Sequence, residues 1–119
     1  MHNLKPKYVS KGWGYEKWIV NKKEYCGKLL FFFKGKKCSW HFHKLKDETF
    51  YIQSGKIKLY WHDEKSDISE AHVRILEKGD IWHVTRKQKH RMEALEDTEL
   101  FEFSTEHFDE DSYRIEKGD

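Results

Sequence analysis

Short apolar and aromatic runs, each closed by a turn signal, recur along the whole chain. Glycine marks several of these turns, as at Lys34-Gly35, Ser54-Gly55 and Lys78-Gly79-Asp80. Between the turns, apolar and polar side chains alternate with period two, most cleanly in Lys56–His62. No segment of helical length has the i, i+3, i+4, i+7 apolar stripe of an amphipathic helix. The sequence therefore predicts an all-β fold, an antiparallel sandwich or barrel.

The chain has 119 residues, which is enough for one domain with a core of its own but not for two. We expect a single domain over residues 13–119, preceded by an N-terminal arm of residues 1–12. The runs between turns predict nine strands: Glu16–Asn21, Cys26–Phe33, Ser39–His43, Glu48–Gln53, Lys56–His62, Ala71–Leu76, Ile81–Val84, His90–Leu95 and Glu99–Ser104.

Charged residues make up 37% of the chain, yet the net charge is only +2 and both signs are interspersed. This pattern is typical of a solvated surface and disfavours nucleic acid as a partner. No window approaches the ~18 apolar residues of a membrane-spanning helix, so no membrane partner is expected. The first residues lack the apolar stretch of a signal peptide. A cytoplasmic location follows as an expectation, with Cys26 and Cys38 reduced.

Two histidines and a carboxylate in the middle of the chain are candidate metal ligands. His41 and His43 are separated by one residue, so on a strand they share a face. Glu48 begins the next apolar run and shares its face with Phe50 and Ile52, where a charge needs a partner. Imidazole nitrogens and carboxylate oxygens are ligands of divalent metals. Taken alone, the histidine pair is equally compatible with surface histidines.

The stretch from Gly35 to Gly55 has the spacing Gly-x5-His-x-His-x4-Glu-x6-Gly, and this resembles the first signature of the cupin superfamily. A second cupin signature is matched at Gly79, Asp80 and His90, whereas Thr85 and Lys87 stand where a proline and a glycine are usual. The resemblance implies a double-stranded β-helix, or jelly-roll barrel. It also implies that His90 completes a divalent metal site with His41, His43 and Glu48, for Zn, Mn, Fe or Ni.

The chain between Trp13 and Arg114 is also similar to the type II mannose-6-phosphate isomerase domains, and among them to the small standalone members. The likeness lies in Trp13-Gly14-Tyr15 and in the acidic run that leads to Asp111 and Arg114. It implies that Arg114 lies near a sugar phosphate or the reacting centre, as a catalytic residue. Those isomerases generally have glutamine where this sequence has His41, so the ligand set here is the generic one of three histidines and a carboxylate.

The resemblance implies a metal-dependent, isomerase-like protein whose substrate is a sugar phosphate or sugar nucleotide, with the metal as Lewis acid. Two alternatives remain open: a binding or sensor protein without turnover, and a metal-dependent dioxygenase or lyase. The sequence pattern does not indicate which residue would act as a general base. Cupins of this size commonly pair sheet on sheet, so we expect a homodimer. The aromatic side chains expected at that contact are Phe31, Phe33, Trp40 and Phe42.

Overall fold

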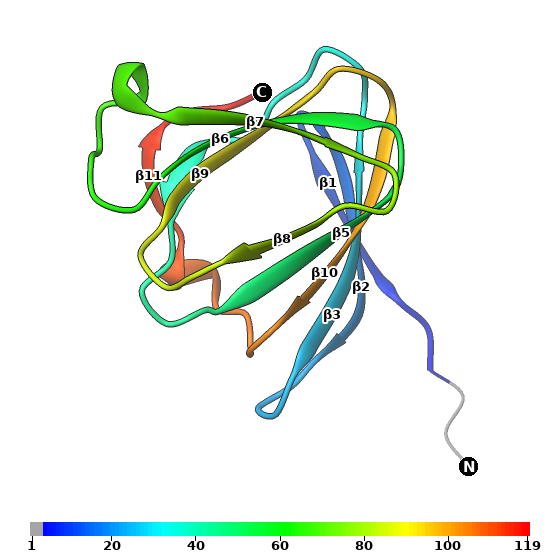
Figure 1. The fold of residues 1–119 in the computed structure, drawn as a ribbon. Helices are drawn as coiled ribbons and strands as arrows, with labels where there is room; N and C mark the ends of the chain where they lie inside the picture. Colours follow the sequence, from blue (N-terminus) through cyan, green and yellow to red (C-terminus); the bar gives the residue numbers. More distant parts are fainter. Residues whose placement is uncertain (1–3) are drawn as a thin grey trace.

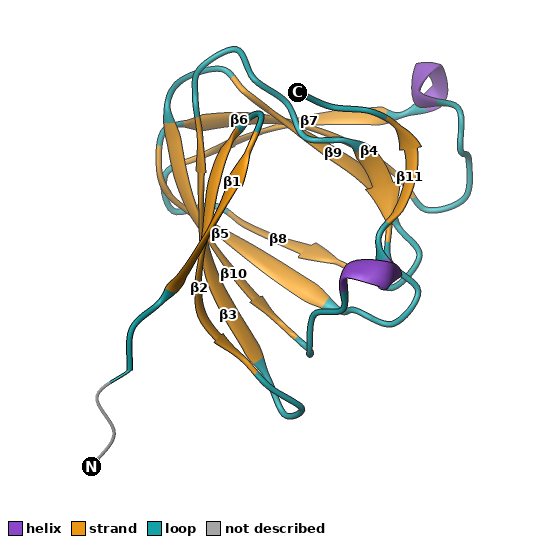
Figure 2. Cartoon of the chain, turned by 180° about the vertical axis from the view of Figure 1, so that it is seen from behind, coloured by secondary structure: helices purple, strands orange, loops and turns teal. Residues whose placement is uncertain are grey.

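The computed structural model describes residues 4–119; residues 1–3 of the predicted N-terminal arm lie outside the described residues. Two antiparallel sheets curve around a common interior (Figure 1 and Figure 2). The strands are β1 (Lys7–Lys11), β2 (Gly14–Asn21), β3 (Cys26–Phe32), β4 (Trp40–Phe42), β5 (Glu48–Ser54), β6 (Lys56–His62), β7 (His72–Glu77), β8 (Ile81–Val84), β9 (Lys89–Ala94), β10 (Thr98–Ser104) and β11 (Tyr113–Glu116).

The larger sheet has the strand order β1-β2-β3-β10-β5-β8, and the smaller sheet has the order β11-β4-β9-β6-β7. Strands that are neighbours in space are therefore often distant in sequence, as in a jelly roll. Within residues 4–119 the helical elements are two short 3-10 turns, η1 (Ile68–Glu70) and η2 (Asp109–Asp111). Among residues 4–119, no helix is both long enough and apolar enough to cross a membrane. The all-β, single-domain architecture predicted from the sequence is confirmed.

Each of the nine predicted strands overlaps a strand of the structure, with ends that differ by at most two residues. The structure adds two edge strands that the sequence did not indicate, β1 and β11. β1 is mostly exposed and contains two lysines among its five residues, and all four residues of β11 are exposed. Edge strands with charged, solvated side chains lack the apolar alternation by which strands are detected.

The inner face of the larger sheet changes character along its strands. At one end, Cys26 of β3, Ser104 of β10 and Glu48 of β5 lie in register, and the next row contains Lys28 and Glu102. Further along the same three strands the inward residues are apolar. These residues are Leu30, Phe32, Ile52 and Leu100, which belong to the hydrophobic core. The barrel therefore has a polar half and an apolar half.

Two turns show how backbone conformation constrains the motif positions. Gly55, the last glycine of the first signature, has a φ of +93°, and a Cβ there would lie 2.3 Å from the Asp97 carbonyl oxygen. Only glycine fits this turn. Lys87 stands where the second signature usually has glycine, and it adopts a φ of +70°. A lysine in this left-handed conformation carries a steric cost that a glycine would not.

The aromatic contact surface expected from the sequence needs two corrections. Phe42 belongs to β4 of the smaller sheet, where its ring stacks on Tyr113. Trp40 has no exposed surface, because the chain after β6 covers it and the indole Nε1 donates a hydrogen bond to the Ser66 carbonyl. Phe31 and Phe33 do lie on the outer face of the larger sheet, where their rings meet edge to face. Phe103 is a further aromatic residue of that face and is 56% exposed.

Candidate metal centre

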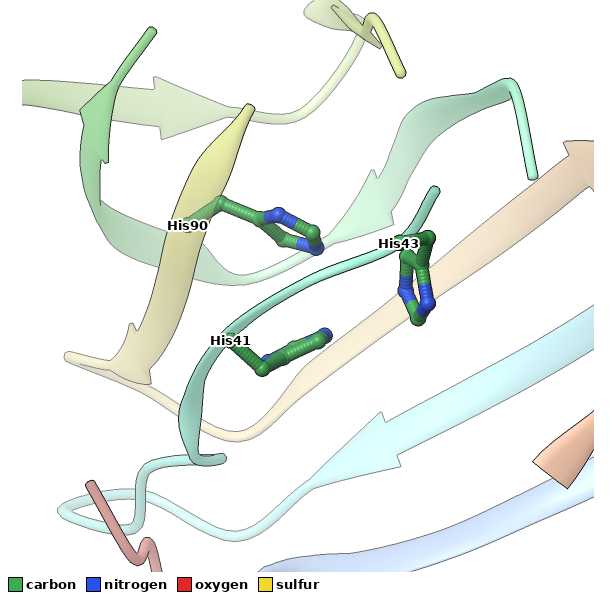
Figure 3. Close-up of side chains that lie close together, drawn as sticks. All are labelled: His41, His43 and His90. Atoms are coloured by element: carbon green, nitrogen blue, oxygen red, sulfur yellow. The ribbon is translucent and has the colours of Figure 1, made fainter. Parts of the chain in front are cut away.

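Three histidines, one from β9, one from β4 and one directly after β4, point toward one another (Figure 3). His41 of β4 lies directly opposite His90 of β9 in the strand register, and His43 follows β4. The strand period places His41 and His43 on the same face, as predicted. One ligand atom from each ring lies within 4.8 Å of the others. The structure thus brings together the three histidines that the sequence selected.

Each of these imidazoles is oriented by a hydrogen bond from its Nδ1 atom to a backbone carbonyl. The acceptors are the carbonyl oxygens of Ser39 for His41 (2.8 Å), of Asp111 for His43 (3.0 Å) and of Gln88 for His90 (3.0 Å). A carbonyl oxygen only accepts, so the proton of each neutral ring is held on Nδ1. The Nε2 lone pairs are left to face the interior. This is the tautomer and orientation that a metal-ligating histidine requires.

Glu48 of β5 closes the group from the opposite sheet. Its Oε2 atom lies 3.2 Å from Nε2 of His43 and 3.5 Å from Nε2 of His90. The side chain is only 2% exposed, and this oxygen is buried without a hydrogen-bond partner. Unprotonated ring nitrogens and a buried carboxylate oxygen that face one another are stabilised by a cation between them. The donor set fits a divalent first-row metal.

The surrounding charges keep this donor set ready to bind a cation. Burial is the largest influence on His41 and, with the neighbouring His90 and His43, holds its pKa well below 6.5. Burial acts to raise the pKa of Glu48, but the neighbouring groups, above all the Lys46 ammonium, outweigh it, and the pKa lies well below 4.5. At neutral pH the imidazole is therefore neutral and the carboxylate is charged, as metal ligands must be.

Lys46 is a buried member of the site that the sequence pattern did not indicate. Its Nζ lies 3.7 Å from Oε1 of Glu48 and 3.0 Å from Oε2 of Glu102, and it meets Nδ1 of His107 at 2.9 Å. The side chain is only 3% exposed. Burial acts to lower its pKa, but the two carboxylates raise the pKa overall, so the ammonium stays charged.

A second buried lysine lies on the wall of the same cavity. Lys28 is 1% exposed, and its Nζ lies 3.4 Å from Oε1 of Glu16 and 4.1 Å from the centre of the Trp18 ring. The indole Nε1 donates to the same Glu16 oxygen at 2.7 Å. One signal in the sequence could have revealed this lysine. It shares the inward face of its strand with Leu30 and Phe32, and a cation at such a position is unusual.

These groups line one cavity of about 300 Å³, to which Trp13 and Arg114 also contribute. Arg114 is exposed on β11 and lies opposite His41 in the strand register. The sequence-predicted Arg114 and the four predicted ligands therefore line a common space. Asp111 does not pair with Arg114, because its carboxylate accepts hydrogen bonds from the backbone amides of Lys44, Leu45 and Lys46.

Comparisons with known proteins agree with this architecture. The sequence matches the family model described as "Cupin domain" over residues 32–105. An oxalate decarboxylase from Bacillus subtilis superposes with a TM-score of 0.78 at 19% identity over 92% of this chain and 30% of its own. The capsular polysaccharide assembling protein CapF from Staphylococcus aureus gives a TM-score of 0.81 at 18% identity over 96% of this chain and 32% of its own.

The chain thus spans about a third of the length of these similar structures. At such low identity the likeness concerns the fold alone. A search of curated protein sequences gives no significant match.

Proposed function

Because this chain belongs to the cupin family, we propose that it is a metal-binding cupin that acts on a sugar phosphate or sugar nucleotide. His41, His43, Glu48 and His90 would hold a divalent ion, for which Zn, Mn, Fe and Ni are the candidates. When bound, the ion supplies a Lewis acid that polarises a substrate oxygen.

One observation carries the metal-binding part of this proposal. The ligand atoms of three tautomer-fixed histidines lie within 4.8 Å of one another, and the Nε2 atoms of His43 and His90 lie within 3.5 Å of a buried Glu48 oxygen that has no hydrogen-bond partner. Without a cation, this arrangement leaves a carboxylate and several lone pairs desolvated and unpaired, at a cost on the order of several kcal/mol. This arrangement is what a preformed set of metal ligands requires.

The part of the cavity wall that contains Lys28 and Lys46 is chemically suited to a hydroxylated substrate. There, ammonium groups alternate with the carboxylates of Glu16 and Glu102, and each ammonium lies within 3.4 Å of a carboxylate oxygen. A sugar presents hydroxyls that both donate and accept, so it can bond to carboxylates and ammonium groups alike. The indole of Trp13, on the same cavity, offers an apolar face to the C–H side of a sugar ring.

Arg114 would bind the phosphate of such a substrate. Its guanidinium is a planar fork of donors that matches phosphate bidentately. The residue is exposed and lines the cavity, so it can meet a charged group that remains near solvent while the sugar enters. In this role Arg114 binds and orients the substrate relative to the four ligands.

The proposal is tested by elemental analysis of the purified protein, followed by a screen of hexose phosphates and sugar nucleotides for binding and isomerisation. We expect about one divalent ion per chain, lost in His90→Ala, and turnover that is lost with it. Tight sugar binding without turnover would favour the sensor alternative. Aerobic turnover that requires ferrous iron would favour the dioxygenase or lyase alternative. A metal-free wild-type protein would contradict the metal site itself.

The role of Arg114 has its own test. Arg114→Ala is expected to bind metal normally but to bind phosphorylated sugars more weakly, so that KM rises more than kcat falls. Arg74→Ala is a matched control, since Arg74 lies on β7, outside the cavity lining. If Arg114→Ala leaves activity intact while His90→Ala abolishes it, the proposed role of Arg114 is wrong.

We also propose that two copies pair through the outer face of the larger sheet. This face presents Tyr8, Phe33 and Phe103, which are 62%, 51% and 56% exposed. Several exposed aromatic residues on the same sheet face are typical of an interaction surface. A second copy offers the same face, as a two-fold symmetric contact requires.

A further inference from the structure

The carboxylate of Asp111 sits in a nest of three consecutive backbone amides. Its Oδ1 accepts from the amides of Lys44 at 2.9 Å and Leu45 at 3.1 Å, and its Oδ2 accepts from the amide of Lys46 at 3.0 Å. Asp111 is only 2% exposed, so its carboxylate depends on these bonds in place of solvation by water. Successive amides that converge on one anion make a strong, charge-assisted contact.

The three amides belong to the loop between β4 and β5, which joins two of the proposed metal ligands. His43 immediately precedes these amides, and Glu48 begins β5 directly after the loop. The loop also supplies Lys46, whose ammonium faces Glu48. Whatever fixes the path of this loop therefore sets the separation of His43, Lys46 and Glu48.

The same residue also holds one of the ligands directly. The backbone carbonyl of Asp111 accepts the hydrogen bond from Nδ1 of His43 at 3.0 Å. Asp111 ends the short η2 turn, so its carbonyl and carboxylate are presented by one rigid piece of backbone. One residue near the C-terminus thus contacts both the ring of His43 and the loop that follows it.

We propose that Asp111 is a positioning residue that sets the metal affinity of the site, an inference that rests on the proposed metal-binding function. Its carboxylate is not a further ligand, because both oxygens are turned to backbone amides. Its action is indirect: it holds the β4–β5 loop so that His43 and Glu48 meet at the right separation. Preorganisation of this kind determines how much binding energy is left after the ligands are ordered.

The test compares Co²⁺ and Zn²⁺ binding by the wild-type chain and Asp111→Asn, titrated well below the unfolding temperature of both. The asparagine keeps the size of the side chain and leaves the backbone carbonyl for His43. It replaces one acceptor oxygen by a donor that faces an amide N–H. We expect metal affinity to fall by about 10- to 100-fold, as for other residues that orient ligands. The visible absorption of bound Co²⁺ should change as well.

Asp67→Asn is the matched control. Asp67 is also a carboxylate that accepts a backbone N–H, from Ser69 at 3.0 Å, but it caps η1. This variant should bind Co²⁺ and Zn²⁺ like the wild-type chain. A lower unfolding temperature in Asp111→Asn with unchanged affinity and an unchanged Co²⁺ spectrum would overturn the inference. Absence of binding in the wild-type chain would instead contradict the proposed metal function, and the inference with it.

Amide hydrogen exchange on the metal-free wild-type chain provides a measurement that does not depend on folding of the variant. The amides of Lys44, Leu45 and Lys46 should exchange as slowly as those of the flanking strands, because the Asp111 carboxylate holds them. Fast exchange of all three amides would show that the loop is not held before the metal arrives. That result would overturn the inference even if Asp111→Asn did not fold.

Discussion

The Nζ of Lys46 lies 3.7 Å from Oε1 of Glu48, so the two oxygens of this buried carboxylate serve different partners. Oε1 faces the ammonium, whereas Oε2 faces the imidazoles of His43 and His90. The ammonium keeps the carboxylate ionised in a dry interior. In this way Glu48 retains a full negative charge and still has an oxygen to offer to a metal.

Glu48→Gln should abolish stable metal binding. The amide keeps the shape of the side chain but loses the negative charge, and it places its neutral end group beside the Lys46 ammonium. We expect the affinity for Zn²⁺ to fall by more than about 100-fold, since the loss of a ligand exceeds the cost of losing a group that merely orients one. Metal content by mass spectrometry checks this. The control Glu24→Gln, at an exposed position, should retain the metal content of the wild-type chain. An unchanged metal content in Glu48→Gln would exclude the Glu48 carboxylate as a ligand.

His41→Gln should retain metal but change which metal is preferred. Of the three histidines His41 is the least buried, and glutamine offers an oxygen in place of the imidazole nitrogen. Oxygen ligands suit Mn²⁺, whereas imidazole suits Zn²⁺ and Ni²⁺. In competition for an equimolar mixture, the variant should therefore bind a larger share of Mn²⁺ than the wild-type chain. An identical Zn²⁺ to Mn²⁺ ratio in the two proteins would contradict His41 as a ligand.

The metal-free protein should lose stability in two steps as the pH falls. The pKa of His41 is below its ordinary 6.5, so the unfolded chain takes up this proton first and stability falls below about pH 6.5. The pKa of Glu48 is below its ordinary 4.5, so its stabilising charge is lost as the pH falls below about 4.5.

Urea unfolding of the chelator-treated protein between about pH 8 and pH 6 measures the upper step, and its continuation from about pH 5 to pH 3 measures the onset of the lower one. His41→Gln should make the upper step shallower without removing it. His107 contributes to the same step, because burial and the Lys46 charge lower its pKa as well. A stability that is independent of pH across the upper range would contradict the neutral, buried state of His41.

Lys87→Gly should stabilise the protein. Lys87 has a φ of +70° while its backbone N–H donates to the His43 carbonyl at 2.7 Å, so the strained conformation is needed for this bond. Glycine adopts it without the steric cost, and we expect a gain of about 1 kcal/mol in the free energy of unfolding. Lys89→Gly, in the regular strand β9, should instead destabilise. A loss of stability in Lys87→Gly would show that the contacts of the lysine side chain stabilise the protein by more than the positive φ costs.

Phe103→Lys should yield a monomer if the proposed pairing is right. The substitution places a charge within the proposed apolar contact, where it is poorly solvated once two copies meet. Light scattering coupled to gel filtration measures the mass in solution. Ile75→Lys is the control, since Ile75 is 44% exposed on β7, in the other sheet. A wild-type chain that is already monomeric, or a dimeric Phe103→Lys, would contradict this interface.

Much of the fold and the His41–His43 pair could be predicted because both depend on local spacing, whereas His90 is added through the resemblance to the second cupin signature. The alternation of side chains predicts strands, and one intervening residue puts His41 and His43 on one face. The contacts of Lys28 with Glu16 depend instead on the register between β2 and β3, which a single sequence does not specify. Asp111 accepts its hydrogen bonds from residues 65 to 67 positions away, and only the folded chain brings them together.

The division of the larger sheet into a polar and an apolar half has a consequence for how the protein can change. On β3, Lys28, Leu30 and Phe32 all line the cavity, and Leu30 and Phe32 also belong to the core. The same strand therefore contributes to the ligand wall and to the packing. A substitution of Lys28 or Glu102 also breaks a buried ion pair, with Glu16 or Lys46 respectively, and leaves the partner charge uncompensated. What the barrel binds can therefore change without loss of stability only when both members of such a pair change together.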